Sequence, residues 1–371
     1  MKVLICCTEY YPHGSGIANV AYNVVQQLRQ RDICCEVCSP IGPDIRLGSS
    51  SLIQRTGRGG LLHYWDSVRR YFRRSARTYD VAWLHYPLFL GGNPFPRCVV
   101  TIHSTAEGIR YPRRLAPYKR LSQMLETFCL NRLTTRAMLT AVSHQSLDQV
   151  QRLTKGNREI ALIRNGVDTN RFLPSKAKGN LRARFGLPPD SLVLLSVGRL
   201  VYHKRPFDLL RLFSEIYGRR ADAMLVVAGR GELLEPARAY AAARGLTGVR
   251  FLGFVPDADL PALYACSDYY ISTSEYEGGE PTLAVAEAMA SGLPCIVCDA
   301  PNRRVIEEAG CGLAVNLNNE QNVFQDVAAY CTSDHNQHAV NARRYAVENL
   351  SWESIATKYL DVFQRAAGVV E

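Results

Sequence analysis

The segment from Ser274 to Gly292 combines residue types that could bind a charged, hydroxyl-rich ligand. It begins with three carboxylates around a glycine pair: Glu275, Glu277, Gly278, Gly279 and Glu280. Good helix formers follow, with Pro281 in the first turn, then Thr282 and Leu283, and with Gly292 just past the end. Free backbone N–H groups and the dipole at such a helix start attract phosphate, whereas carboxylates suit hydroxyl groups. The segment therefore predicts a site for a nucleotide or a nucleotide-sugar.

The helix within this segment needs neighbours that bury it. One face of it would consist of four apolar residues: Leu283, Ala286, Met289 and Ala290. Short apolar runs at 269–272 and 294–298 flank the segment and are typical of buried strands. A strand, a glycine-rich turn and a helix would hold the carboxylates at one edge of a parallel sheet.

Two cations and two glycines follow other predicted strands of the second half. Arg199 and Lys204 come after the strand at 192–197, at the end where open parallel sheets bind ligands. The alternative for these two cations is a basic turn that is simply exposed to solvent. Gly229 and Gly231 follow the strand at 223–228 and either approach a ligand closely or form an ordinary turn.

The first half has its own candidates. Gly14 and Gly16 lie in a glycine loop after the first strand, where a backbone without Cβ atoms can approach a phosphate. His103 follows the strand at 99–102, again at the carboxyl end. The alternative for His103 is a histidine that only bonds the backbone.

Strand and helix patterns alternate through both halves of the chain. This alternation predicts an α/β protein with two Rossmann-like, doubly wound domains facing across a cleft. The first domain is expected at 1–172 and the second at 180–350, with a polar seam between them. A last helix within 351–371 has Trp352, Ile355, Tyr359 and Phe363 on one face, which needs a partner.

Composition excludes several classes of protein. No apolar run among the 371 residues approaches the ~20 needed to span a bilayer, and the start resembles a strand more than a signal peptide. A cytoplasmic location follows. The twelve cysteines are expected to be buried thiols. Asp257 or Asp259 is expected to cap the next helix, so no metal site is predicted.

The positive charge is concentrated in one segment. Residues 46–136 contain sixteen Lys or Arg and four Asp or Glu, a balance of +12 in a chain of net charge +10. A glycine-rich stretch at 42–60 is expected to be a mobile loop, followed by a helix at 61–77. This helix carries Arg69, Arg70, Arg73 and Arg74, and a second basic cluster further along the chain contains Arg113 and Arg114. They favour a peripheral contact with an anionic membrane, and the alternative is a solvated face.

Ordered motifs along almost the whole chain resemble one family. In the second half they are Ser196–Leu200, Lys204, Gly229–Glu232, Phe251–Val255 and Glu287–Gly292. In the first half they are the loop at 14–16, His103, Val142-Ser143 and Asn165–Asp168. The chain resembles the retaining glycosyltransferases of family 4 (group 1), which have the GT-B fold of two Rossmann-like domains. The helix within 351–371 resembles the last helix of this family, which implies that it packs back on the first domain.

The resemblance implies roles for particular residues. Arg199 and Lys204 would hold the donor diphosphate, Glu287 would accept hydrogen bonds from the ribose, and His103 would lie beside the transferred sugar. The family's first glutamate falls on Gly279 here, so Glu280, or else Glu277, is expected to replace it. The other contacts to the substrate or nucleotide would come from Gly14, Gly16, Asn165, Gly229, Gly231, Gly278, Gly279, Pro281, Thr282 and Leu283.

The resemblance also implies the reaction. A hexosyl group would pass, with retention and without a metal or other cofactor, from a nucleotide sugar to an acceptor hydroxyl. A UDP-sugar is the first choice of donor and GDP-mannose the second, and the acceptor would be a saccharide or a lipid-linked sugar. In the family, the departing diphosphate takes the acceptor proton, and no carboxylate pair of the glycosidase kind stands out in this sequence.

Three other functions compete with this one. A nicotinamide-dependent dehydrogenase would need a Gly-x-Gly-x-x-Gly turn, but Asn19 stands where its third glycine belongs. A nucleic-acid-binding protein would explain the basic segment but not the acidic turn. A nucleotide-sugar epimerase shares the GT-B fold and is distinguished by whether label passes to an acceptor.

Overall fold

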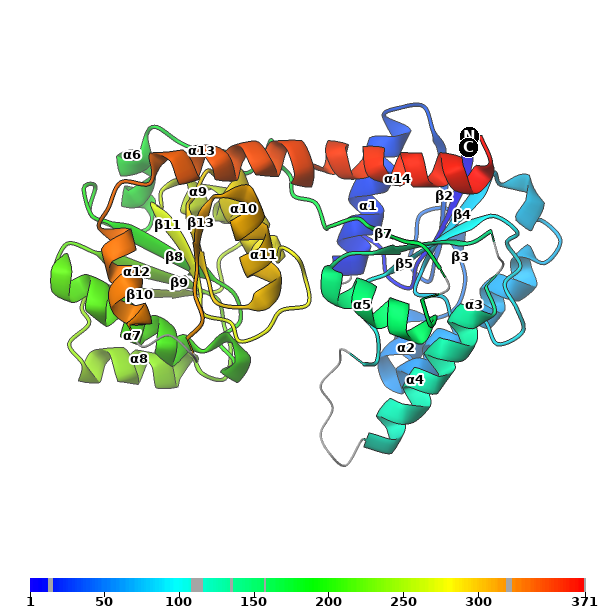
Figure 1. The fold of residues 1–371 in the computed structure, drawn as a ribbon, viewed down its shortest axis with the longest axis horizontal. Helices are drawn as coiled ribbons and strands as arrows, with labels where there is room; N and C mark the ends of the chain where they lie inside the picture. Colours follow the sequence, from blue (N-terminus) through cyan, green and yellow to red (C-terminus); the bar gives the residue numbers. More distant parts are fainter. Residues whose placement is uncertain (13–15, 108–115, 134–135, 157, 318–321, 370–371) are drawn as a thin grey trace. The chain divides into compact units, whose positions relative to one another are not determined.

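The computed structural model describes the chain except residues 13–15, 108–115, 134–135, 157, 318–321 and 370–371. The described chain forms two compact units, one of residues 1–165 and 352–371, the other of residues 166–351 (Figure 1). The expected first domain ran to residue 172. Residues 166–172 belong instead to the second unit, because Val167 and Phe172 are buried in its core.

The first unit is built on a parallel sheet of seven strands. In chain order these are β1 (Lys2–Cys6), β2 (Cys34–Ser39), β3 (Ile45–Arg46), β4 (Val81–His85), β5 (Cys98–Ile102), β6 (Met138–Ala141) and β7 (Ile160–Leu162). Their order across the sheet is β3-β2-β1-β4-β5-β6-β7. The alternation of side chains along β1 places Val3 and Ile5 in one core and Leu4 and Cys6 in another. Both faces of the sheet are therefore covered.

Two helices from opposite ends of the chain cover one face. These are α1 (Gly16–Arg29) and α14 (Trp352–Ala367), which share one buried cluster. The cluster contains the apolar face of α14: Trp352, Ile355, Tyr359 and Phe363. The other face is covered by α3 (Arg58–Phe72), α4 (Ala116–Asn131) and α5 (His144–Leu153).

The stretch at 42–60 is not the loop that its glycines suggested. It contains β3 and the helix α2 (Ser50–Thr56), which begins where the Ser49 hydroxyl accepts the Leu52 N–H at 3.3 Å. A Cβ added to Gly60 would lie 2.5 Å from Ile53 Cα, so this glycine allows α2 and α3 to pack closely. The helix α3 ends at Phe72 rather than at residue 77, and a short 3₁₀ helix, η1 (Ala76–Thr78), follows.

The second unit contains a parallel sheet of six strands. These are β8 (Val193–Val197), β9 (Met224–Ala228), β10 (Val249–Gly253), β11 (Tyr269–Ser272), β12 (Cys295–Val297) and β13 (Gly312–Ala314). Their order is β10-β9-β8-β11-β12-β13. The strands β9 and β10 lie on one side of β8, and β11, β12 and β13 lie on the other. The order therefore reverses between β8 and β11, which makes this a topological switch point.

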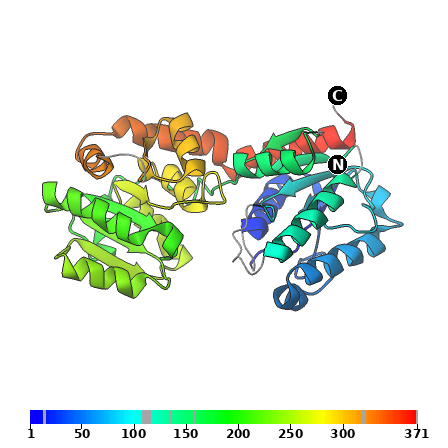
Figure 2. The same cartoon turned by 60° about the horizontal axis from the view of Figure 1, so that its bottom comes forward.

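Helices pack on both faces of this sheet. One face carries α7 (Pro206–Arg219), α8 (Leu234–Ala243) and α12 (Val323–Cys331). The other carries α6 (Lys178–Arg184), α9 (Leu260–Ala265), α10 (Leu283–Ala290), α11 (Ala300–Ala309) and α13 (Asn336–Tyr345). Figure 2 shows α7 and α8, in green, on one side of the sheet and the yellow and orange α10 and α11 on the other.

The helix at the acidic turn differs from its prediction in two respects. It begins at Leu283, with the Thr282 hydroxyl accepting the Val285 N–H at 3.4 Å, so Pro281 precedes the helix instead of lying in its first turn. Leu283 was expected in the buried face but is 38% exposed. The buried face consists of Val285, Ala286, Ala288, Met289 and Ala290. Gly292 follows with φ +70°, as expected for a residue that ends a helix.

Two further expectations concern cysteines and aspartates. All twelve cysteines are free, and ten of them are buried. Asp259 occupies the N-cap position of α9 but makes no capping hydrogen bond. Asp259 is thus at the predicted cap position, but its carboxylate and that of Asp257 pair with Arg184 and Arg171 at 2.9 and 2.8 Å. Within the described residues, every helix is too short or too polar to cross a bilayer.

Candidate functional site

The loops after β8 and β11 meet at the switch point of the second unit. A small cavity of about 30 Å³ opens between them and is lined by both. Arg199 and Lys204 contribute from the loop after β8, and Ser272, Thr273 and Ser274 contribute from β11 and the loop after it. The predicted cations therefore lie at the carboxyl ends of the strands, next to the start of the acidic turn.

Hydrogen bonds join the two loops. The Thr273 hydroxyl lies 2.9 Å from the Lys204 carbonyl and 3.1 Å from that of Arg205, and it can donate to either. The Glu275 N–H donates to the His203 carbonyl at 2.7 Å. The rings of His203 and Tyr276 stack, with centroids 4.7 Å apart. These contacts hold the cationic loop and the acidic turn as one surface.

Opposite charges face each other in this surface. The Lys204 ammonium forms an ion pair with the Glu277 carboxylate, and both side chains are largely sheltered from solvent. Arg199 is exposed beside the same cavity. Arg205 lies 3.9 Å from Glu275. The site thus combines cations that suit a diphosphate with carboxylates that suit hydroxyl groups.

The three candidate glutamates differ in environment. Glu280 is 1% exposed, whereas Glu277 is partly buried in its ion pair with Lys204. Glu287 lies in α10 and is partly buried. Burial raises the pKa of Glu287 to about 7, although the Tyr264 hydroxyl and Arg171 act in the opposite direction. Glu287 thus changes charge near neutral pH.

The start of α10 is fixed by two residues that the sequence analysis did not identify. The Asn302 side-chain oxygen accepts the Thr282 N–H at 2.9 Å. Asn302 in turn donates to both oxygens of Asp299, from its backbone at 3.0 Å and its side chain at 2.8 Å. Both residues are completely buried, and burial raises the pKa of Asp299. The Asp-x-x-Asn cap of α11 was the available sequence signal.

The predicted glycines of the second unit have a packing role. Gly229 has φ +149°, and a Cβ on it would lie 1.8 Å from the Gly198 carbonyl oxygen. A Cβ on Gly231 would lie 2.2 Å from the Leu200 carbonyl oxygen. These glycines let the loop after β9 pass directly against the loop that carries Arg199. In the acidic turn, Gly278 is exposed and Gly279 is partly buried, and both precede the cap of α10.

In the first unit, His103 follows β5 and contacts a second histidine. Its Nε2 lies 3.0 Å from Nδ1 of His85, the last residue of β4. Gly16 is the first residue of α1. Asn165 is the last residue before the second unit, and its side-chain oxygen is buried without a partner among the described residues. Gly14 lies outside the described residues.

The predicted arginines Arg69, Arg70, Arg73 and Arg74 lie on α3 or just after it, and the apolar face of α3 belongs to the core. Trp65, Val68 and Phe72 are completely or almost completely buried. Arg69 and Arg70 pair with Asp66 at 2.9 and 2.7 Å. Arg73 and Arg74 are exposed, and Arg113 and Arg114 lie outside the described residues.

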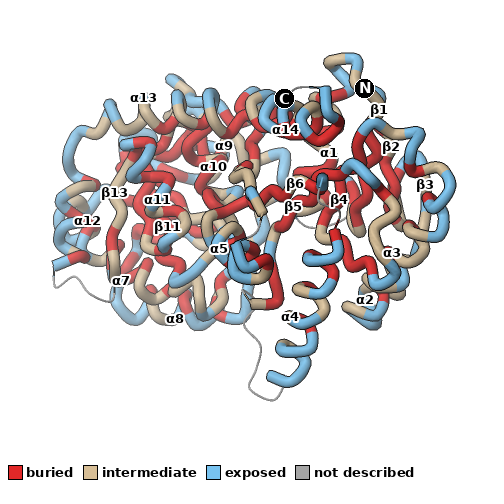
Figure 3. Tube along the Cα trace, turned by 45° about the vertical axis from the view of Figure 1, so that its right-hand side comes forward, coloured by how far each residue is buried: buried red, intermediate tan, exposed pale blue. Residues whose placement is uncertain are grey.

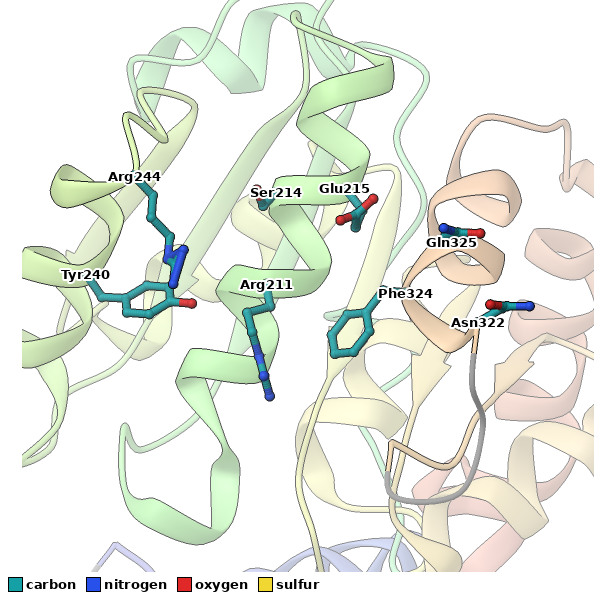
Figure 4. A pocket seen from close by; sticks show the side chains of 8 residues that line it. All are labelled: Arg211, Ser214, Glu215, Tyr240, Arg244, Asn322, Phe324 and Gln325. Carbon is teal, nitrogen blue, oxygen red and sulfur yellow. The ribbon is translucent and has the colours of Figure 1, made fainter.

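A larger groove of about 370 Å³ lies elsewhere in the second unit, between α7, α8 and α12 (Figure 4). It is lined by Arg211, Ser214, Glu215, Tyr240, Arg244, Asn322, Phe324 and Gln325. None of the residues predicted for the site contributes to it. Of the predicted residues, Arg199 and Lys204 line the smaller cavity at the strand ends.

Two family models match the chain, one in each half. The model described as glycosyl transferases group 1 matches residues 177–348, and the one described as glycosyltransferase family 4 matches residues 14–171. The chain belongs to this family of glycosyltransferases, whose fold is GT-B. The family predicted from the motifs is thus confirmed.

Individual relatives are distant. Spore coat protein SA of Bacillus subtilis is 26% identical over 266 residues, which cover 67% of this chain and 69% of that protein. The UDP-Gal:alpha-D-GlcNAc-diphosphoundecaprenol alpha-1,3-galactosyltransferase of Escherichia coli is 31% identical over 164 residues. That match covers 43% of this chain and 42% of the galactosyltransferase. The shared part is therefore less than half of either protein.

Solved structures share the fold over nearly the full length. Sucrose-phosphate synthase from Thermosynechococcus elongatus aligns with a TM-score of 0.75 and 17% identity over 100% of both chains. Anabaena Alr3699/HepE in complex with UDP-glucose aligns with a TM-score of 0.66 and 19% identity, over 98% of this chain and 99% of that one. At such identities, the similarity shows the GT-B fold.

Proposed function

We propose that this glycosyltransferase moves a hexosyl group from a nucleotide-diphosphate sugar to an acceptor hydroxyl, with retention of configuration and without a metal. The observation that carries this proposal is the joining of two loops at the switch point of the second unit. One loop contributes Arg199 and Lys204, and the other contributes Glu277 and leads to Glu280 and α10. Fixed cations beside carboxylates suit a ligand that carries both a diphosphate and hydroxyl groups.

The chemistry assigned to these residues is charge stabilisation. When the bond between the sugar C1 and the diphosphate oxygen breaks, negative charge grows on the leaving group, and Arg199 and Lys204 stabilise it. The acceptor oxygen bonds to C1 on the same face, and its proton passes to the departing diphosphate. Glu287 accepts hydrogen bonds from the ribose, while Glu280, or else Glu277, binds hydroxyl groups of the sugar. His103 contacts the transferred sugar.

We favour a UDP-sugar as the donor and GDP-mannose as the second choice. Anabaena Alr3699/HepE, which shares the fold, was solved with UDP-glucose, and the Escherichia coli relative is named for UDP-Gal. The absence of a metal requirement is proposed because side chains supply the cations at this site. Asp257 and Asp259, which resemble a metal motif, are paired with arginines instead.

The acceptor is proposed to be a saccharide or a lipid-linked sugar, reached at an anionic membrane surface. Support comes from α4, which is largely exposed in Figure 3. Four of its apolar side chains are exposed: Tyr118, Leu121, Met124 and Phe128. Together with the exposed Arg120 of the same helix, these side chains make the mixture of apolar and basic groups that binds anionic leaflets, and Arg73 and Arg74, just after α3, are exposed as well. This surface would keep the enzyme near a membrane-anchored acceptor.

Incubation with donors labelled in the sugar tests the reaction. Label should pass from a UDP-sugar to a lipid or saccharide extract, with release of UDP and at an equal rate in saturating EDTA. A strict requirement for Mg²⁺ or Mn²⁺ would contradict the metal-free proposal. Conversion of the donor sugar without transfer would indicate an epimerase.

A further inference from the structure

His85 is a buried histidine with no role assigned so far. It ends β4, and its ring packs between those of Trp83 and His103, with centroid distances of 4.3 and 5.3 Å. The side chain is 1% exposed. Its Nδ1 lies 3.0 Å from His103 Nε2, the length of a direct hydrogen bond. His85 therefore contacts the one residue of the first unit that the family resemblance places beside the sugar.

Both imidazole rings are neutral around pH 7. Burial lowers the pKa of His103 to about 4. Burial and the neighbouring His103 lower the pKa of His85 well below its usual value. Each neutral ring carries one N–H and one bare nitrogen, so one ring must donate in this hydrogen bond and the other must accept.

The surroundings of His85 decide which ring donates. Its Nε2 is buried and has no hydrogen-bond partner among the described residues. If His103 donated, His85 would carry its proton on Nε2 and bury an unpaired N–H. If His85 donates from Nδ1, the unpaired atom is only an acceptor. Buried unpaired N–H groups are rarer than under-satisfied acceptors.

We propose that His85 is a positioning residue that donates from Nδ1 to His103 Nε2 and thereby fixes the tautomer of His103 with its proton on Nδ1. His103 then presents a neutral N–H donor, and its Nε2 is already occupied. The role of this N–H rests on the proposed function: His103 donates a hydrogen bond to a hydroxyl oxygen of the donor sugar. It does not act as a base.

The tautomer can be measured without any substrate. We would label the full chain with ¹⁵N-histidine, assign His103 from the spectrum of His103→Gln, and identify which ring nitrogen carries the proton. We expect the proton on Nδ1 in the wild type. His85→Asn keeps an N–H donor near the Nδ1 position and should preserve this tautomer. His85→Leu removes the donor and should shift His103 towards the form protonated on Nε2.

Kinetics add a second readout. His85→Leu should lower kcat by about tenfold, the effect of losing roughly 1.4 kcal/mol, while His85→Asn stays within about threefold of wild type. His338→Asn, a histidine of α13 in the second unit, is the control for histidine removal. A wild-type His103 protonated on Nε2 would overturn the proposal, even if the kinetic effect appeared. A chain that transfers no sugar leaves the tautomer result intact and refutes only the proposed function.

If His85→Leu fails to fold, the spectra of wild type and of His85→Asn still test the proposal. Both must show the His103 proton on Nδ1.

Discussion

The Lys204 ammonium is paired with the Glu277 carboxylate, which joins the loop after β8 to the acidic turn after β11. The lysine was predicted as a diphosphate ligand and the glutamate as a ligand of sugar hydroxyls. Each side chain compensates the charge of the other, and both are largely sheltered from solvent. In the proposed reaction, a bound diphosphate would share Lys204 with Glu277, and the ion pair would orient the cation before the nucleotide binds.

The pair gives the first prediction. Lys204→Ala should lower kcat/KM by ~100-fold or more, because a preorganised cation is lost where charge develops in the transition state. Glu277→Gln should cost less, since Lys204 remains. Lys176→Ala removes an exposed lysine of the same unit and is the matched control. Full activity of Lys204→Ala would remove this residue from the catalytic machinery.

The second prediction concerns pH. Burial raises the pKa of Glu287 to about 7 in the folded chain, above its value of 4.5 in the unfolded one. The folded state therefore binds more protons between these values, and this group lowers stability as pH rises from about 4.5 to 7. Glu287→Gln should remove this dependence. The melting temperature of the variant, relative to that of wild type, should therefore increase as pH rises from about 4.5 to 7. A constant difference between the two proteins would contradict the assignment.

Nucleotide affinity should depend on pH in the opposite direction to stability. In the proposed function Glu287 accepts hydrogen bonds from the ribose, which a carboxylate does better than the protonated acid. Nucleotide affinity should therefore rise as pH increases through about 7. In Glu287→Gln this rise should disappear, which calorimetric titration at several pH values would show.

The third prediction tests how the start of α10 is held. Asn302→Leu leaves the Thr282 N–H without its acceptor and removes the side-chain donor to one oxygen of the buried Asp299 carboxylate, while the backbone N–H at 302 still donates to the other oxygen. It should lower the free energy of unfolding by about 1–3 kcal/mol and weaken nucleotide binding. Urea unfolding measures the first effect. Arg304→Ala, at an exposed position on the same helix, should change stability little.

How far the sequence predicts this site depends on the range of the interactions. Arg199, Lys204 and the three glutamates were identified because each lies next to a recognisable strand or helix. The contacts of Asn302 and His85 were missed, because they join residues far apart in the chain whose register only the folded sheets define.

Local signals also misled in identifiable ways. Gly60 suggested a loop, but in the structure it is the point where two helices touch. Pro281 suggested the first helical turn, yet the bond from Thr282 to Asn302 and the Thr282 cap place the start of α10 one residue after Thr282. In both cases tertiary packing overrode a sound local preference.

The fourth prediction concerns the membrane. The chain should co-sediment with vesicles rich in anionic lipid at low salt and less at high salt, because exposed arginines are screened. The double variant Leu121→Gln, Met124→Gln should reduce binding, since both side chains are exposed on α4. Val340→Gln replaces an apolar residue of α13 that is also exposed, and it should have no effect. An absence of binding to anionic vesicles at low salt would favour a soluble acceptor.

The central claim is that the switch point of the second unit binds a nucleoside diphosphate through Arg199 and Lys204. The most direct test is the melting temperature of wild type, Arg199→Ala, Lys204→Ala and the control Lys176→Ala across a concentration series of UDP and GDP. A ligand that binds only the folded state must raise the melting temperature in proportion to the logarithm of its concentration. We predict a rise with UDP for wild type and Lys176→Ala, and a much smaller one for the other two variants. Equal rises in all four proteins, or none with either nucleotide, would contradict the account.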